Sequence, residues 1–187
     1  GFVHPACVGF QIDAHGRKNV LFSRMGHNIQ LTDFIDEIEA LCNEILPKVT
    51  ETMDILPHDA NRKYDVSPNS ALDIFHNKGI KNVETIYVKK EASYAQINEE
   101  LKQFSKGEPM VRFDSKTCSD LLQTMAGYTR HEETGIARKD NYFEHLSDAF
   151  KLGCFYIAKK MTLNESVEMQ EPSYYKMKFG EENKVLQ

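Results

Sequence analysis

The sequence lacks several features that would assign it to a familiar class of proteins. Its 187 residues contain no apolar run close to the roughly 18 residues that a membrane span needs. The N-terminus has no charged segment followed by an apolar one, so we expect neither a secretory signal nor a membrane partner. A G-x-x-x-x-G-K-S/T motif is absent, which excludes a P-loop ATPase within this chain. No internal repeat is present.

Cysteines are few and widely spaced. None of the four belongs to a C-x-x-C pair, and each lies in an apolar stretch, where a free cysteine behaves as a small apolar side chain. We therefore expect buried, reduced thiols and an intracellular protein. Hydrophobic residues make up 41% and charged residues 27% of the chain, which is typical of a globular domain with its own core.

The formal net charge of −5 argues against a protein that coats nucleic acid by neutralising phosphates. It does not argue against a nuclease, because bound cations offset the acidic residues of a metal site. Basic residues do cluster locally, at Arg130–His131, Arg138–Lys139 and Lys159–Lys160.

Hydrophobic periodicity predicts an α/β fold that opens with a β-hairpin and continues as alternating strands and helices. Such alternation predicts a sheet that contains parallel strands and carries helices on its faces. Thr32 is expected to cap the first helix, Pro68 to open the second and Gly79 to close it. The predicted strands lie at 2–13, 19–25, 53–56, 83–88 and 110–113, and the predicted helices at 32–45, 68–78, 93–104, 115–128 and 141–160.

The last third of the chain divides into a loop, a helix and a tail. Residues 129–139 are charged and without periodicity, which predicts an exposed loop before the final helix. After Thr162 the composition turns polar, and we expect that segment to be ordered only where something docks it. The sequence thus predicts one domain at residues 1–161 and a polar C-terminal tail at residues 162–187.

Asp59 is the first candidate for chemistry. It follows a predicted core strand directly, and in open α/β sheets ligands gather at the carboxyl ends of the strands. An ordinary aspartate that caps a turn or helix is the alternative interpretation.

His145 and Asp148 form an H-x-x-D pair on the last predicted helix. Residues three apart share one helical face, so the imidazole and the carboxylate can converge on one point. Such ligands suit a hard divalent cation that keeps open positions for water and phosphate oxygens. A solvated surface pair is the alternative here.

Three blocks of sequence, in the same order, resemble the C-terminal nuclease domain of the large terminase subunit of tailed bacteriophages. They are G-F-V-H-P-A at residues 1–6, L-P-H-D-A at residues 56–60 with a helix ending at Gly79 after it, and H-L-S-D-A-F at residues 145–150. The resemblance extends to about residue 160, and it depends on the last two blocks occurring together, because either alone is a weak signal.

This resemblance implies a ribonuclease-H-like mixed sheet flanked by helices, and an endonuclease that cuts concatemeric double-stranded DNA during genome packaging. It implies two Mg²⁺ or Mn²⁺ ions, with Asp59 and Asp148 as metal ligands and catalytic residues. His145 would be an accessory ligand or would orient water or phosphate. The expected mechanism is two-metal hydrolysis, in which one metal activates water and the other stabilises the leaving oxygen.

The family pattern also implies a context for the chain. Its first metal aspartate usually lies two residues before a glycine that matches Gly1, and this chain begins at that glycine. Asp13, at the far end of the same predicted strand, is poorly placed to replace it, so we expect weak metal binding and impaired cleavage by the chain alone. An upstream ATPase domain of the same protein, the portal and the small terminase subunit are the implied partners, in the cytoplasm of the infected or lysogenic bacterial host.

Four basic residues are candidates for contacts with the DNA backbone, against the alternative of ordinary solvated charge. They are Arg130, Arg138, Lys139 and Lys151. Two other functions stay open: a noncatalytic docking module that binds portal or partner subunits through residues 162–187, and another ribonuclease-H-like enzyme such as a resolvase or a transposase core.

Overall fold

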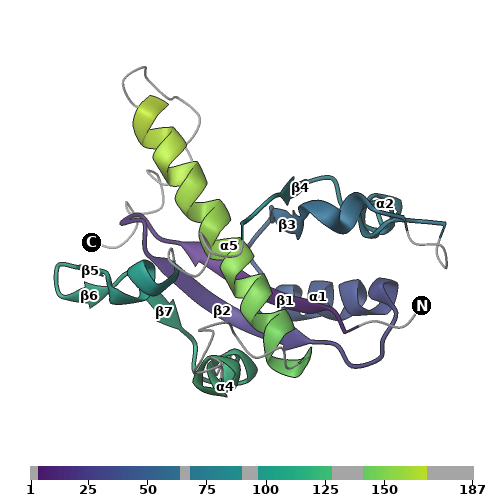
Figure 1. Cartoon of the computed structure of the whole chain (residues 1–187), viewed down its shortest axis with the longest axis horizontal. Coiled ribbons are helices and arrows are strands. Elements are labelled where there is room, and N and C mark those ends of the chain that lie inside the picture. Colours follow the sequence, from purple (N-terminus) through teal and green to yellow (C-terminus); the bar gives the residue numbers. More distant parts are fainter. Residues whose placement is uncertain (1–3, 64–67, 90–96, 128–140, 168–187) are drawn as a thin grey trace, which may run out of the picture.

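The structure, a computed structural model, describes residues 4–63, 68–89, 97–127 and 141–167, and it is a mixed α/β fold. Figure 1 shows the arrangement of its elements. They are β1 (Ala6–Ile12), β2 (Lys18–Met25), α1 (Leu31–Ile45), β3 (Asp54–Pro57), the 3-10 turn η1 (His58–Asn61), α2 (Ala71–Asn77), β4 (Val83–Ile86), β5 (Phe104–Ser105), β6 (Glu108–Pro109), β7 (Val111–Phe113), α4 (Ser119–Gly127) and α5 (Asn141–Val167). Residues 97–102 are also helical.

The described strands form three small sheets. In the largest, β2 lies between β1, which is antiparallel to it, and β7, which is parallel to it. The second sheet is the parallel pair β3–β4, and the third is the short antiparallel pair β5–β6. The predicted β1–β2 hairpin and the predicted parallel strands are therefore confirmed, while the ribonuclease-H-like arrangement of one continuous sheet stays a prediction.

The long helix α5 crosses one face of the β1–β2 hairpin and closes the main core (Figure 1). Phe150 of this helix stacks on Phe10 of β1, with 5.8 Å between the ring centroids. Gly153 gives Phe10 the room to approach, because a Cβ at this glycine would lie 2.3 Å from a ring carbon. The buried side chains of the core come from β2, β7, α4, α5 and the turn before α4: Val20, Met25, Val111, Cys118, Leu121, Leu146, Phe150 and Cys154.

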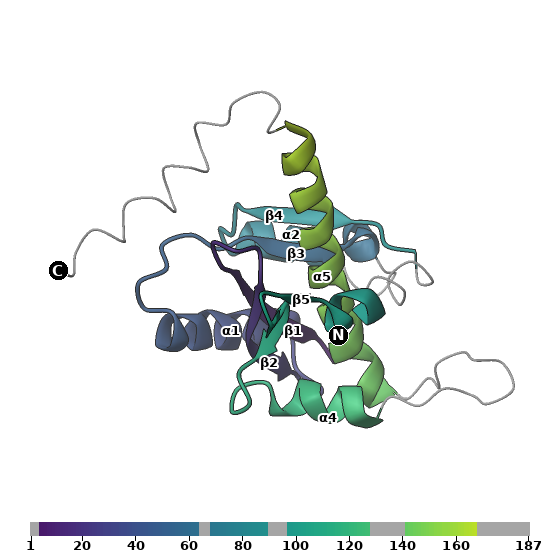
Figure 2. The same ribbon diagram turned by 90° about the vertical axis from the view of Figure 1, so that its left-hand side faces the viewer.

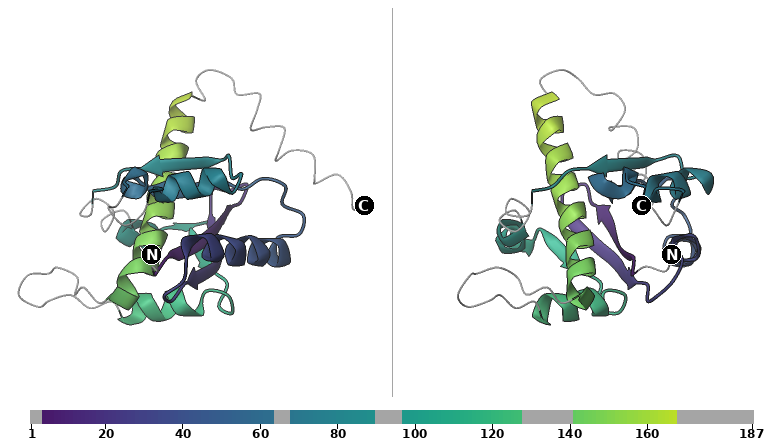
Figure 3. Two further views of the ribbon diagram at one scale, coloured as in Figure 1. Left: turned by 90° about the vertical axis from the view of Figure 1, so that its right-hand side faces the viewer. Right: turned by 45° about the vertical axis from the view of Figure 1, so that its right-hand side comes forward.

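Helix α1 lies on the other side of the hairpin from α5, as Figures 2 and 3 show. Three elements meet around Cys7 of β1. Burial raises the pKa of the Cys7 thiol to about 12, and the Asp54 carboxylate of β3 and the Cys42 thiol of α1 add to the shift. The hairpin is thus covered on both faces. Among the described residues, no helix is both long and apolar enough to cross a membrane.

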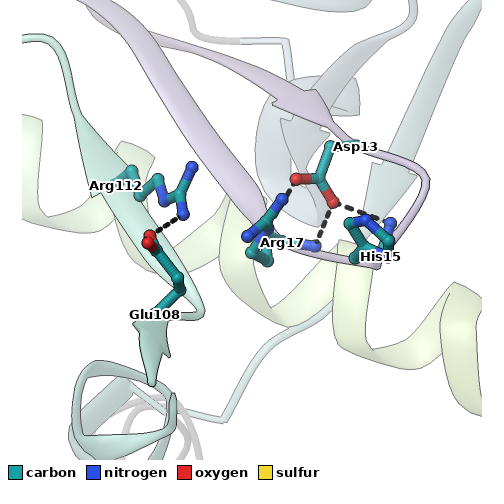
Figure 4. A network of polar contacts seen from close by, with 5 residues as sticks. All are labelled: Asp13, His15, Arg17, Glu108 and Arg112. Carbon is teal, nitrogen blue, oxygen red and sulfur yellow. Dashed lines mark hydrogen bonds and ion pairs between the residues drawn. The ribbon is translucent and has the colours of Figure 1, made fainter. Parts of the chain in front are cut away.

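The turn of the β1–β2 hairpin is organised by Asp13 (Figure 4). One carboxylate oxygen accepts hydrogen bonds from the backbone N–H groups of His15 and Arg17, and the other accepts from Arg17 Nε at 2.6 Å. Desolvation raises the pKa of Asp13, but these hydrogen bonds outweigh it and hold the pKa below its usual value. Arg112 pairs with Glu108 beside this turn. The Asp13 carboxylate is therefore occupied by the turn.

A buried ion pair joins the helix at residues 97–102 to the main sheet. Lys18 Nζ of β2 lies 3.3 Å from a Glu100 carboxylate oxygen, and the two side chains are only 6% and 3% exposed. Cys154 of α5 lies against the pair; burial, the Glu100 charge and a hydrogen bond to Glu100 raise the pKa of its thiol, against the opposing Lys18 charge. The pair fixes this helix because separating it would leave a buried charge.

Several predicted element ends were wrong. Helix α1 starts at Leu31, one residue before Thr32, and its N-cap Gln30 makes no side-chain hydrogen bond. Helix α2 starts at Ala71 rather than near Pro68, because Ser70 and Asp73 form a capping box there. Gly79 does close α2, with a φ of 82° that favours glycine.

The chain after residue 93 also differs in part from the prediction. Phe104, expected at the end of a helix, pairs with Pro109 in the β5–β6 hairpin. Helix α5 continues to Val167, beyond the expected start of the tail at residue 162. Residues 93–96, the predicted loop at 129–139 and the tail from residue 168 lie outside the described residues.

Candidate functional site

The carboxyl end of the β3–β4 pair brings three of the most informative side chains together. Pro57 of β3 is paired in register with Ile86 of β4, so His58 and Tyr87 leave the sheet side by side. Their rings meet edge to face, with 4.7 Å between the centroids. Asp59 follows immediately in η1, where it is partly exposed, and its carbonyl oxygen accepts a hydrogen bond from the backbone N–H of Arg62.

Helix α5 presents the second pair of candidates. His145 is exposed, and the Asp148 side chain is 51% exposed, while Leu146 and Phe150 between and beyond them are buried in the core. Both residues therefore lie on the exposed side of the helix, which is also the position that the alternative of a solvated surface pair expects. Lys151, one turn later, forms an ion pair with Asp148.

Helix α5 also connects the main sheet to the β3–β4 pair. Tyr156 Oη lies 2.8 Å from Met53 Sδ just before β3, and Lys160 Nζ lies 3.1 Å from a Glu84 carboxylate oxygen on β4. These contacts are at the amino ends of the two strands and two to three turns after Asp148 on the helix. Asp59 is at the opposite end of β3.

The predicted convergence of Asp59 and Asp148 on one cation stays a prediction. Within the described residues, no three side chains among His, Cys, Asp and Glu form a group that could hold a metal ion. Mg²⁺ and Mn²⁺ nevertheless suit carboxylates, and Mg²⁺ is commonly bound by one or two of them together with water and substrate phosphates. The donor atoms of Asp59, Asp148 and His145 are therefore of the kind that these ions take, although the described residues supply too few of them to complete a site.

The predicted DNA-backbone contacts divide into two groups. Arg130, Arg138 and Lys139 lie outside the described residues. Lys151 is described, and its side chain is only 7% exposed, with its ammonium on Asp148. Its charge in this structure thus neutralises a candidate metal ligand and does not face solvent.

Two side chains of the β3–β4 region were missed from the sequence. Asp54 begins β3, and burial together with the Glu39 charge raises the pKa of its carboxyl group. The signal was an aspartate inside the apolar run at residues 53–56. Tyr87 is 60% exposed beside His58. In the sequence it is only an aromatic residue at the end of a predicted strand. The register of β3 and β4 is needed to place it beside His58.

The chain was compared with protein-family models, with curated proteins and with solved structures. None of the three comparisons gives a match. A functional assignment therefore depends on the placement of Asp59, Asp148 and His145, and on the blocks of sequence that surround them.

Proposed function

We propose that this chain is a divalent-metal-dependent DNA endonuclease domain that resembles the nuclease of phage terminase large subunits. One observation carries the proposal. Asp59 follows a strand of a parallel pair at its carboxyl end, and Asp148 is exposed on the helix that packs against both that pair and the main sheet. Each carboxylate lies within one of the two blocks, P-H-D-A and H-x-x-D-A-F, on which the resemblance depends.

Each candidate residue that the structure describes has a role in this proposal. A bound divalent cation supplies a water molecule of lowered pKa and neutralises charge on the phosphate. Asp59 and Asp148 hold the cation or cations, and His145 orients water or a phosphate oxygen from the same side of α5. Lys151 neutralises Asp148 while no cation is bound, which lowers the repulsion between carboxylates at the site.

The proposed substrate is double-stranded DNA, cut as a concatemer during genome packaging in the cytoplasm of a bacterial host. A ribonuclease-H-like sheet, an ATPase domain in a longer protein, and contacts with portal and small terminase subunit belong to the same proposal. The described mixed α/β fold with its parallel strand pair supports it in general terms, because such sheets collect ligands at the carboxyl ends of their strands.

Nicking of supercoiled plasmid in the presence of Mn²⁺ tests the proposal. The assay uses this chain and any longer protein that contains it, and it compares wild type with Asp148→Asn. We expect a loss of about 100-fold or more, because changes even to the outer shell of a metal site cost roughly 10- to 100-fold. Cleavage that survives Asp148→Asn unchanged would contradict the proposal.

The chain offers a matched control. Asp36 of α1 is 63% exposed and forms an ion pair with Lys78, much as Asp148 does with Lys151. Asp36→Asn removes a comparable charge and ion pair away from the site, and we expect it to leave cleavage unchanged. Portal binding without any cleavage would favour the docking module, and a preference for branched over linear DNA would favour a resolvase.

A further inference from the structure

Tyr87 is a large aromatic side chain that the fold leaves open to solvent. It is 60% exposed, although it directly follows Ile86, which is buried at the end of β4. The edge of the His58 ring rests against it at a centroid distance of 4.7 Å and an interplanar angle of 88°. The T-shaped contact supports the tyrosine on one side and leaves much of the ring surface free.

Exposed cations lie on the segments next to Tyr87. Lys89 is exposed two residues further along the chain, and Arg62 is exposed at the end of η1, which packs beside β4. Lys63 follows Arg62 and is paired with Asp73 at 3.5 Å. Asp59 lies in the same turn, and Asp73 offsets Lys63, so these segments carry two cations, Arg62 and Lys89, against one carboxylate, whereas the chain as a whole has a net charge of −5.

An exposed aromatic ring with cations on neighbouring segments is an arrangement with which proteins hold unpaired nucleotides. Every base offers a π-face for stacking, and the cations attract the backbone phosphates. An apolar protein surface would use the ring but would gain nothing from the cations, and an acidic peptide would use the cations but not the ring. The combination favours single-stranded nucleic acid.

We infer that Tyr87, supported by His58, stacks on an unpaired nucleobase next to Asp59. This inference rests on the proposed nuclease function and names the form of its substrate. The strand held at the carboxyl end of β3 and β4 has at least one base free of its partner, as in a frayed end or a locally melted duplex. Inside an intact duplex the base faces are stacked on one another, so only the terminal pairs offer a face to Tyr87.

Fluorescence can test this directly, because the chain contains no tryptophan. Tyr87→Trp introduces a single reporter at the proposed stacking position. Phe104→Trp is the matched control, since Phe104 is similarly exposed, at 66%, and lies in the β5–β6 hairpin. Both variants are titrated with a short oligothymidine strand and with a blunt duplex, without divalent metal, so that binding is measured separately from cleavage.

We expect the single strand to quench the fluorescence of Tyr87→Trp and to leave that of Phe104→Trp unchanged, with a weaker response to the duplex. By anisotropy, Tyr87→Ala should bind the labelled single strand about tenfold more weakly, in line with the stacking free energy of one base, while Tyr87→Phe should bind like wild type. Thermal melts followed by circular dichroism check that the variants are folded.

The stacking inference and the nuclease proposal are overturned by different results. No quenching of Tyr87→Trp, equal quenching of both reporters, or unchanged binding by Tyr87→Ala would overturn the stacking inference, even if Mn²⁺-dependent cleavage were present. Absence of cleavage by a longer protein that contains this chain, with the quenching pattern intact, would overturn the nuclease proposal and leave a single-strand-binding surface at this end of the sheet.

Discussion

The Lys151 ammonium is paired with the Asp148 carboxylate one turn earlier on α5, and the two side chains differ greatly in exposure. Lys151 is 7% exposed and Asp148 is 51% exposed. The lysine stem is held in the fold while the aspartate reaches solvent, so the protein supplies a fixed positive charge behind a carboxylate that we expect to bind a cation. The first prediction follows from this arrangement.

Lys151→Met should strengthen Mn²⁺ binding. Methionine keeps an unbranched side chain in the buried position and removes the charge that repels a cation at Asp148. We expect the affinity to rise about three- to tenfold, since solvent screens the repulsion at a half-exposed carboxylate. Calorimetric titration with Mn²⁺ measures it. Unchanged or weaker binding would show that the cation does not bind beside Asp148.

Gly153→Ala should destabilise the protein, although alanine is the better helix former. The added Cβ would lie 2.3 Å from the Phe10 ring, which is itself stacked on Phe150. Overpacking of a core costs about 1–3 kcal/mol, whereas the helix propensity of alanine returns about 1 kcal/mol. Urea denaturation should show a net loss, and Phe10→Leu in the same chain should reduce it. A gain in stability would contradict the described packing of α5.

Removing Lys18 should be costly. Lys18→Met leaves the Glu100 carboxylate buried with less compensation, and breaking a buried ion pair in this way costs about 3–5 kcal/mol. Adding Glu100→Gln removes the charge and should recover part of that loss. The free energy of unfolding of the single and double variants measures both effects. If Lys18→Met costs less than about 1 kcal/mol, the pair is not buried as described.

The capping box of α2 predicts a dependence of stability on pH. Hydrogen bonds from the backbone N–H and the side chain of Ser70 hold the pKa of Asp73 below its usual value. A carboxyl group with a lowered pKa in the folded state stabilises the protein above its unfolded pKa, and this contribution is lost as the pH falls through the folded pKa. The difference in unfolding free energy between wild type and Asp73→Asn should therefore shrink on acidification from pH 7.

The other half of the same box gives a test that is independent of pH. Ser70 is buried, and its hydroxyl accepts a hydrogen bond from the Asp73 backbone N–H at 3.1 Å. Ser70→Ala should cost about 1 kcal/mol at neutral pH, as is usual for an N-cap. A constant difference for Asp73→Asn from neutral to acidic pH, together with a neutral Ser70→Ala, would refute the capping role.

The parts of the fold that local patterns control could be predicted from the sequence. Helical spacing correctly gave α1 and α5, and Leu146, Phe150, Cys154 and Ile157 of the predicted apolar stripe are buried. Gly79 closes α2 because the backbone adopts a left-handed conformation there. Glycine favours that conformation, so its presence in the sequence predicts the end of the helix. The position of Asp59 after a strand followed from a short apolar run bounded by Pro57.

The features that could not be predicted are of two kinds. Some depend on a backbone conformation that the residue type does not indicate, and others depend on contacts between segments far apart in the sequence. The β5–β6 turn has Lys106 and Gly107 at φ values of 54° and 82°, and a lysine is not the usual residue at such a position. At the candidate site, the contact between Tyr87 and His58 depends on the register between β3 and β4. The i,i+3 spacing of Asp148 and Lys151 predicts that the two side chains share a helical face, but it does not predict that the lysine is buried.

The central claim is that Asp59 and Asp148 serve one metal site, and a double-mutant cycle on Mn²⁺ affinity tests it most directly. Asp59→Asn, Asp148→Asn and the double variant are titrated with Mn²⁺ in the presence of a DNA oligonucleotide. If the two carboxylates share a site, the double variant should be little weaker than the worse single variant, because residues that act together are not additive. Fully additive losses, or a loss for only one aspartate, would mean that the two carboxylates bind no common cation and would contradict this account.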